Sequence, residues 1–271
     1  MSSPVAIARS VSTPARALAG LAVACALALL GPRRATAAPP ASARPSGAPV
    51  DAAPFVVVLD PGHGGSNLGA AAADGLLEKD VTLALARRVR ARLETAPGVR
   101  VVVCRERDVL VPIRARARCA AAAHADLFVS LHANATPAGV APGSQRGFEL
   151  YVLPPEDVED DATLAALAAP PGAGVWAAHV VRATAERSAT AARKLDLRLR
   201  QALGERLARG VRQTGAALDV LRGTGAPGVL VEVGFLDNVA DRTLLTSAEG
   251  QDRVADALAS AALDARVAAS R

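Results

Sequence analysis

Uninterrupted apolar stretches, each followed by polar or glycine-rich residues, recur along the chain. The first, FVVVL at residues 55–59, is apolar at every position rather than at alternate positions. This pattern is typical of a strand buried on both faces, as in a parallel sheet covered by helices. Similar stretches predict further strands at residues 98–104, 125–135, 147–153 and 228–235.

Helical periodicity fills the intervals between these stretches. Apolar residues recur at every fourth position from Val81 to Leu93, which marks one face of a helix over residues 78–94. An Arg/Ala segment at residues 111–124, opened by Pro112, predicts a second helix. Further helices are expected at residues 188–213, 237–245 and 251–268. The alternation predicts an α/β fold: a single domain with a parallel-rich mixed sheet of about six strands and helices on both faces.

The first 37 residues differ from the rest of the chain. Arg9 and Arg16 precede an apolar run at residues 18–30, which is short for a membrane span, and Ala35 to Ala37 supply the small residues of a cleavage site. This predicts a secretory signal peptide over residues 1–37 and export to the periplasm or the cell exterior. An uncleaved anchor is the alternative. A lipoprotein attached at Cys25 is disfavoured, because the apolar run continues past that cysteine.

Composition changes the picture of charge and of domain limits. Residues 1–37 hold four of the 31 basic residues and no acidic residue, so the remainder has 27 basic and 26 acidic residues. Such a balance gives no case for nucleic-acid binding. Residues 38–53 have the Pro/Ala-rich composition of a linker, and residues 54–271 are long enough for one domain. We expect a monomer.

Two cysteines, Cys104 and Cys119, lie in this domain. An exported domain can bridge them, so their redox state is open. They make no disulfide framework and no thiolate metal site.

Ionisable side chains follow three of the predicted strands. His63 stands in the glycine-rich turn after residues 55–59, His132 ends the third strand, and Glu232 lies in the last strand. Ligands bind beyond the carboxyl ends of strands in open α/β sheets, so these side chains should share one rim. Glu78 begins the helix after the first strand and can lie over the same rim.

Two imidazoles and two carboxylates match the needs of a hydrolytic zinc site. A catalytic zinc uses three nitrogen or oxygen ligands and keeps its fourth position for water. We therefore expect one Zn²⁺ per chain, held by His63, Glu78 and His132, with Glu232 as the general base. Taken singly, His132 could be a core histidine and Glu232 a structural carboxylate, but four coincident placements favour the metal site.

The blocks DPGHGG, LLEKDVTLALARRV, ADLFVSLHANA, GFELYVL and PGVLVEVGFLDNVADRTLL occur in this order. Together they resemble the zinc-dependent N-acetylmuramoyl-L-alanine amidases of the type-3 amidase family, over residues 55–268. The resemblance implies that His63, Glu78 and His132 bind zinc and that Glu232 is catalytic. It also implies an amidase catalytic domain over residues 54–271.

The same resemblance supplies a substrate. It is the amide between the lactyl group of N-acetylmuramic acid and the L-alanine of the peptidoglycan stem peptide, cleaved in cell-wall remodelling, daughter-cell separation or lysis. A zinc peptidase acting within the stem peptide is one alternative, and an inactive wall-binding relative is another. The presence of all four site residues speaks against the second.

Other polar residues have less distinct roles. Asn134 either hydrogen-bonds substrate or stabilises its turn. We interpret His124 and His179 as ordinary helix residues, and Asp108 and Arg114 as supports for the second strand–helix junction.

Residues 154–187 form an unusually long connection between a strand and a helix. They are either a solvated acidic loop or a regulatory insertion, since some wall amidases resembling this one are held inactive by an inserted helix until a partner protein withdraws it. In the second case a carboxylate would occupy the open position of the metal until an activator protein withdrew it. The candidate carboxylates are Glu156, Glu159, Asp160 and Glu186.

Overall fold

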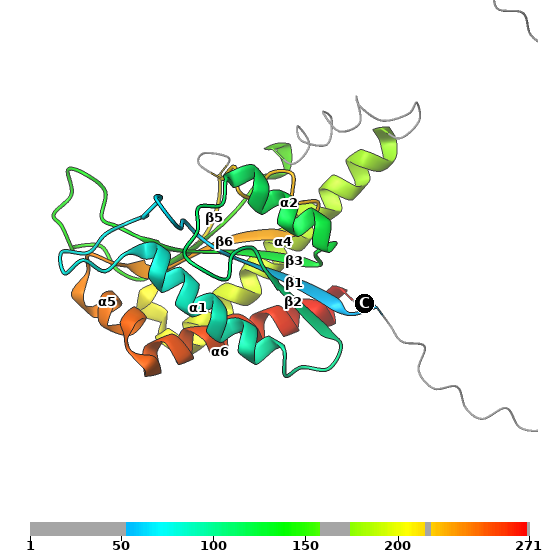
Figure 1. The fold of residues 1–271 in the computed structure, drawn as a ribbon. Helices are drawn as coiled ribbons and strands as arrows, with labels where there is room; N and C mark the ends of the chain where they lie inside the picture. The colour runs from blue at the N-terminus through cyan, green and yellow to red at the C-terminus, as the bar shows by residue number, and fades with distance from the viewer. Residues whose placement is uncertain (1–52, 158–173, 215–217, 270–271) are drawn as a thin grey trace, which may run out of the picture. The chain divides into compact units, whose positions relative to one another are not determined.

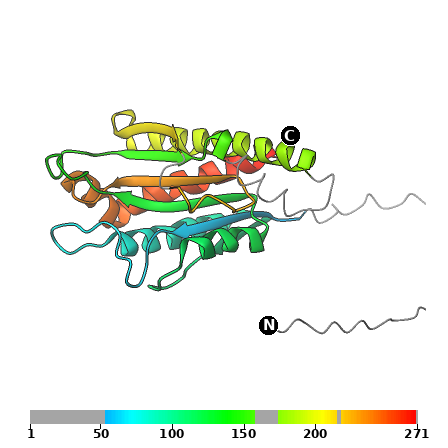
Figure 2. The ribbon, with the colours of Figure 1, turned by 90° about the horizontal axis from the view of Figure 1, so that it is seen from above.

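A six-stranded mixed sheet is the centre of the molecule, seen in a computed structural model that describes residues 53–157, 174–214 and 218–269 (Figure 1). These residues lie within one compact unit, Pro49–Arg271. The strand order is β2-β1-β3-β6-β4-β5, and Figure 2 shows β1, β3, β6, β4 and β5 side by side. The predicted α/β class is confirmed.

The strands run in two directions. Their bounds are β1 (Phe55–Pro61), β2 (Val99–Val103), β3 (Leu127–Asn134), β4 (Phe148–Val152), β5 (Ala208–Gln213) and β6 (Gly228–Phe235). β1, β2, β3 and β6 are parallel, whereas β4 runs antiparallel to β6 and parallel to β5. The carboxyl ends of β1, β3 and β6 therefore meet at one edge of the sheet.

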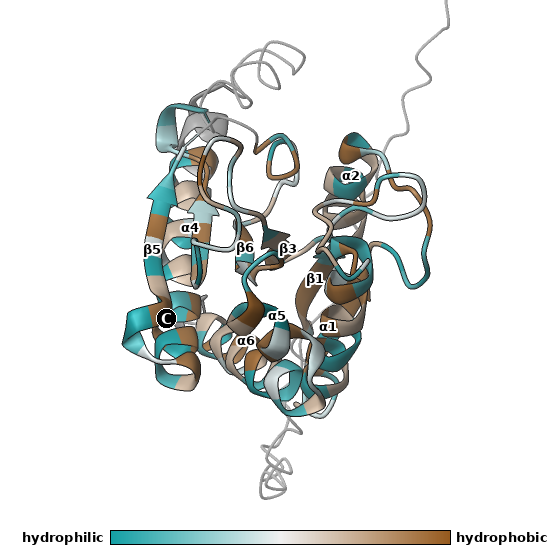
Figure 3. Ribbon diagram, turned by 90° about the vertical axis from the view of Figure 1, so that its left-hand side faces the viewer, coloured by the Kyte–Doolittle hydropathy of each residue, from teal (hydrophilic) through white to brown (hydrophobic). Residues whose placement is uncertain are grey.

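Helices cover both faces. They are α1 (Glu78–Leu93), α2 (Ile113–Ala123), α4 (Gly174–Leu203), α5 (Val239–Thr246) and α6 (Ala248–Ala269), with a short 3₁₀ turn at Glu205–Leu207. Buried side chains of α1, α4 and α6 share one apolar cluster, and those of α2 belong to a second cluster on the opposite face. Figure 3, which looks along the strands, shows α2 across β1 and β3 from α1 and α6.

The two clusters explain the uninterrupted apolar runs. In β1, Val57 and Leu59 enter the first cluster, and Val56 and Val58 enter the second. Successive side chains of a strand point to opposite faces, so a strand covered on both faces is apolar at every position.

One predicted element is wrong at both ends. The helix expected over residues 188–213 begins at Gly174 and ends at Leu203. Gly204, with φ 101°, turns the chain, and Ala208–Gln213 forms the edge strand β5. The segment ARGVRQ is partly exposed and pairs on one side only, so it lacks the apolar run by which the other strands were recognised. β4 lies between β6 and β5, inside the sheet.

Cys104 and Cys119 are joined in a disulfide between the end of β2 and α2. Among the described residues, no helix is both long and apolar enough to cross a membrane. The expected signal peptide and nearly all of the expected linker lie outside these residues.

Candidate metal centre

The turn that follows β1 is held by two buried arginines. Arg116 donates to the carbonyl of Pro61 at 2.7 Å and to that of His63 at 2.5 Å. Arg105 donates to the intervening carbonyl of Gly62 at 2.7 Å. Sequence reasoning did not single out either arginine, because an arginine-rich chain offers many equivalent candidates. Three successive carbonyls are thereby fixed where the sheet ends.

His63 itself has a strained backbone. Its φ of 60° lies in the left-handed region, which costs a non-glycine residue about 1–3 kcal/mol and is found disproportionately at functional sites. The preceding Gly62 is needed for another reason. A Cβ atom there would lie 2.4 Å from the imidazole Cε1 of His132, so the ring packs directly on the Gly62 backbone.

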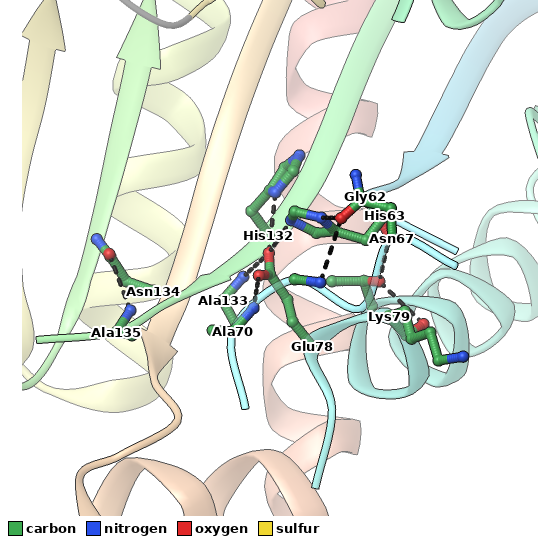
Figure 4. Close-up of polar contacts among 12 residues, drawn as sticks. Gly62, His63, Asn67, Ala70, Glu78, Lys79, His132, Ala133, Asn134 and Ala135 are labelled. Carbon is green, nitrogen blue, oxygen red and sulfur yellow. Dashed lines mark hydrogen bonds and ion pairs between the residues drawn. The ribbon is translucent and has the colours of Figure 1, made fainter. Parts of the chain in front are cut away.

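Glu78, at the first position of α1, brings the two histidines together. Its Oε1 lies 3.0 Å from His63 Nε2 and 2.9 Å from His132 Nδ1 (Figure 4). The backbone N–H of Ala133 donates to the same oxygen at 3.0 Å, and that of Ala70 donates to Oε2 at 2.8 Å. The loop after β1, α1 and β3 therefore each contribute one side chain to a single cluster.

The ionised carboxylate at the centre of this cluster favours a bound cation. Burial alone would raise the pKa of Glu78, but hydrogen bonds with His132 and His63 outweigh it and lower that pKa well below its usual range. The hydrogen bond with Glu78 raises the pKa of His63. Asn67, which sequence reasoning missed, has its Oδ1 2.8 Å from His63 Nδ1. A proton on Nδ1 would leave Nε2 free as a metal ligand.

The residues fit zinc. One candidate ligand atom from each of His63, Glu78 and His132 lies within 4.8 Å of the others, and the described residues contain no second such group. Tetrahedral ligands at about 2.0–2.1 Å from zinc stand about 3.3 Å apart, close to the two imidazole–carboxylate distances. Two nitrogens and one oxygen are also a ligand set that catalytic zinc uses.

Glu232 lies beside this cluster on β6. It is in register with His132 of β3, so both side chains project from the same face of the sheet. Its buried Oε2 has no hydrogen-bond partner among the described residues. Burial, followed by the negative charges of Glu78 and Glu149, raises the pKa of Glu232 to about 8. A carboxyl group with that pKa can both accept and release a proton near neutral pH.

Asn134 turns away from the histidines toward a residue that sequence reasoning passed over. Its Nδ2 donates to Oε1 of buried Glu149 at 2.8 Å, and its Oδ1 accepts from the N–H of Ala135. Glu149 is in register with Glu232, one strand farther from the metal ligands. Polar and apolar residues alternate only weakly in residues 147–153, so the sequence did not reveal that Glu149 would pair with Glu232.

The remaining polar residues lie around or away from the cluster. Asp108 accepts from the Gly65 N–H at 2.6 Å and from Lys79 Nζ at 2.7 Å, which joins the histidine loop to α1. Arg114 is exposed on α2. His124 caps the C-terminus of α2 in a left-handed conformation, and the side chain of His179 lies outside the described ones.

Residues 154–187 include the first part of α4, residues 174–187. Glu156 is exposed in a short turn of helix after β4. Glu186 lines a cavity of about 350 Å³ together with Phe55 and Leu127, the first residues of β1 and β3. That cavity is at the end of the sheet opposite the histidines, so Glu186 is wrong as a carboxylate for the metal. Glu159 and Asp160 lie outside the described residues.

Comparison with known proteins places these features in a family. The profile of the N-acetylmuramoyl-L-alanine amidases matches residues 57–264. The chain is 36% identical to an endolysin of Bacillus phage SPP1, over 70% of this chain and 58% of that protein. It is 34% identical to an N-acetylmuramoyl-L-alanine amidase, AmiC, of Neisseria meningitidis, over 76% of this chain and 51% of that protein.

A solved structure gives the same result. The N-acetylmuramoyl-L-alanine amidase AmiC2 of Nostoc punctiforme superposes with a TM-score of 0.58 at 31% identity, covering 78% of this chain and 96% of that one. The two sequence relatives are longer, and the chain spans only 58% and 51% of their lengths.

Proposed function

Because this chain belongs to the N-acetylmuramoyl-L-alanine amidase family, we propose that it hydrolyses the amide between N-acetylmuramic acid and the L-alanine of the peptidoglycan stem peptide. One observation carries the proposal to these residues. His63, Glu78 and His132 converge within 4.8 Å, next to a buried Glu232 oxygen that has no partner among the described residues. Metal ligands and a proton acceptor are the two parts that amide hydrolysis by water requires.

The side chains divide the work. His63, Glu78 and His132 would hold a zinc ion, which when bound acidifies water and polarises a carbonyl group. Glu232 would take a proton from the attacking water and deliver it to the leaving amine of L-alanine. Its buried Oε2, which has no partner among the described residues, is available for both transfers. Asn67 would keep His63 in the orientation that presents Nε2.

The proposal includes export and regulation. Residues 1–37 have the composition of a signal peptide, which suits an enzyme that meets peptidoglycan outside the cytoplasm. We propose that this enzyme is a monomer that binds one zinc ion. Residues 154–173, with Glu156, Glu159 and Asp160, would carry the inhibitory carboxylate that an activator protein withdraws. Deleting these residues should then increase dye release from labelled peptidoglycan. Equal release from the folded, zinc-loaded deletion variant would contradict this part.

The reaction is tested by digesting purified muropeptides with the zinc-loaded protein and identifying the products by mass spectrometry. An amidase releases an intact stem peptide with a new amine on L-alanine, whereas a stem-peptide peptidase cleaves that peptide internally. Glu232→Gln should retain zinc and lose activity by about 10²–10⁴-fold. His63→Ala should lose zinc, measured by elemental analysis.

Two results would overturn the assignment. A His63→Ala protein with full zinc occupancy would remove His63 from the ligand set. A zinc-free Glu232→Gln protein would make Glu232 a ligand and Glu78 the suspected base.

A further inference from the structure

Two arginines of the edge strand β5 point toward one carboxylate of β4. The Nε atoms of Arg209 and Arg212 each lie 3.2 Å from Oε2 of Glu149. The other oxygen of Glu149 already accepts hydrogen bonds from Asn134 and Tyr151, both at 2.8 Å. Both guanidinium groups therefore compete for a single oxygen atom.

A β-bulge places both arginines on the same face of the sheet. Residues three apart in a regular strand point to opposite faces. Here Phe148 pairs with Ala208 and Leu150 pairs with Val211, so β5 has one residue more than β4 between these pairs. Ala208 and Val211 both pack on the apolar cluster beneath, and the residue after each of them is an arginine. Bulges that re-aim side chains in this way are over-represented near active sites.

This face is the one that carries the candidate metal centre. Glu149 is in register with Glu232, which is in register with His132. Neighbouring strands are about 4.8 Å apart, so Glu149 lies about 10 Å across the sheet from His132. That distance corresponds to about three residues of extended peptide.

The charge of the arginine pair is not balanced. Among the described residues, Glu149 is the one carboxylate that either guanidinium contacts. Arg209 is also fixed by Gln145 at 3.1 Å and by the Phe235 ring, whose centroid is 5.0 Å away. The Arg212 side chain is 52% exposed. One guanidinium is thus held in place, and the other faces solvent with donors to spare.

We propose that Arg209 and Arg212 form a subsite for a carboxylate of the substrate's peptide, about three residues beyond the scissile amide. The inference rests on the proposed amidase function, because it concerns the stem peptide that leaves in that reaction. A stem peptide carries free carboxylates within this reach, and guanidinium groups bind carboxylates through paired, charge-assisted hydrogen bonds. Glu149 holds the arginine pair in place, and a substrate carboxylate would supply a second negative charge.

The test uses two muramyl tripeptides that differ only in whether the stem carboxylates are free or amidated. Arg212→Gln should lower kcat/KM for the free acid by about 10-fold or more through KM, because a hydrogen bond to a charged group is lost. The amidated substrate should change less than about twofold. Arg212→Lys should recover part of the loss, and the exposed Arg114→Gln serves as the matched control.

Calorimetric binding of both tripeptides to zinc-loaded Glu232→Gln protein, with and without Arg212→Gln, separates this inference from the proposed function. Tighter binding of the free acid that disappears with Arg212→Gln supports the subsite, even if the wild-type protein cleaves neither compound and the amidase proposal fails. Equal losses for both tripeptides, or no loss for either, overturn the subsite.

Discussion

Two arginine–carboxylate clusters border the candidate metal centre, and they differ in burial and in how many of their donors are already hydrogen-bonded. On the α2 side, Arg116 pairs with Asp60 at 2.6 Å, and the two side chains are 5% and 0% exposed. On the β5 side, Arg209 and Arg212 share Glu149, and their side chains are 29% and 52% exposed.

The difference separates a structural role from a binding role. Arg116 uses its remaining donors on the carbonyls of Pro61, His63 and Val111, and Asp60 pairs with it in the interior. Nothing there is left for a ligand, and the histidine turn is held rigidly. Among the described residues, the β5 cluster has two guanidinium groups for one carboxylate, and the Arg212 side chain is half-exposed. The same residue types therefore serve different ends according to how many of their hydrogen bonds are already made.

The largest effect concerns Glu232, which lies in the sheet between the two clusters. Burial, with the charges of Glu78 and Glu149, raises its pKa to about 8, above the usual 4.5. The folded metal-free protein therefore binds more protons than the unfolded chain between these values, so the free energy of unfolding falls as pH rises from 4.5 to 8. Glu232→Gln should remove a penalty of up to about 5 kcal/mol above pH 8 and change little near pH 4.5.

Urea denaturation of chelator-treated protein at pH 5 and pH 9 measures this change. Glu106→Gln, which alters an exposed carboxylate, is the control. If the free energy of unfolding varied with pH in the same way for wild-type and Glu232→Gln protein, burial would not raise the pKa of Glu232, and the prediction would be wrong.

Breaking the α2-side cluster should cost nearly as much. Arg116→Met leaves Asp60 buried and unpaired, so we expect the free energy of unfolding to fall by about 3–5 kcal/mol and zinc to bind more weakly. Asp60→Asn combined with Arg116→Met should recover part of this loss, because the buried charge is then removed. Arg114→Met, exposed on the same helix, should change stability by less than about 0.5 kcal/mol. A similar small change for Arg116→Met would remove the structural role assigned to this cluster.

The disulfide cross-links the same side of the molecule. Cys104 and Cys119 are 15 residues apart, and closing such a loop contributes about 3 kcal/mol in the chain-entropy account. Cys104→Ala with Cys119→Ala should lower the free energy of unfolding by about 2–4 kcal/mol, with lost amide-exchange protection concentrated in α2 rather than β5. Dithiothreitol should reproduce the loss in wild-type protein and leave the double variant unchanged. Equal loss of protection in α2 and β5 would contradict this side-specific effect.

The same contrast explains how far the sequence alone could lead. Apolar runs predicted five strands, because β1, β3 and β6 are buried on both faces and β2 and β4 are also largely apolar. The positions of the strands located His63, His132 and Glu232. β5 was missed because an edge strand with a bulge and two arginines has no apolar run. Glu149 reaches the site through the register of β4 with β6, and Arg105 and Arg116 hold the turn after β1 through contacts that are distant in sequence. Local sequence spacing encodes neither the register nor these contacts.

The smallest effect is a difference in salt dependence. Arg212→Ala removes a half-exposed charge from a cluster that already has a surplus, so we expect a change in stability within about 1 kcal/mol at low salt. Raising sodium chloride to about 1 M should reduce this change toward zero, because exposed charges are screened over about 3 Å at that ionic strength. The cost of Arg116→Met should persist, since water and ions do not reach a pair that is 5% and 0% exposed. Urea denaturation at both salt concentrations measures the two responses. If Arg212→Ala instead cost several kcal/mol independently of salt, Arg212 would be a structural partner of Glu149, and both clusters would serve only to hold the fold.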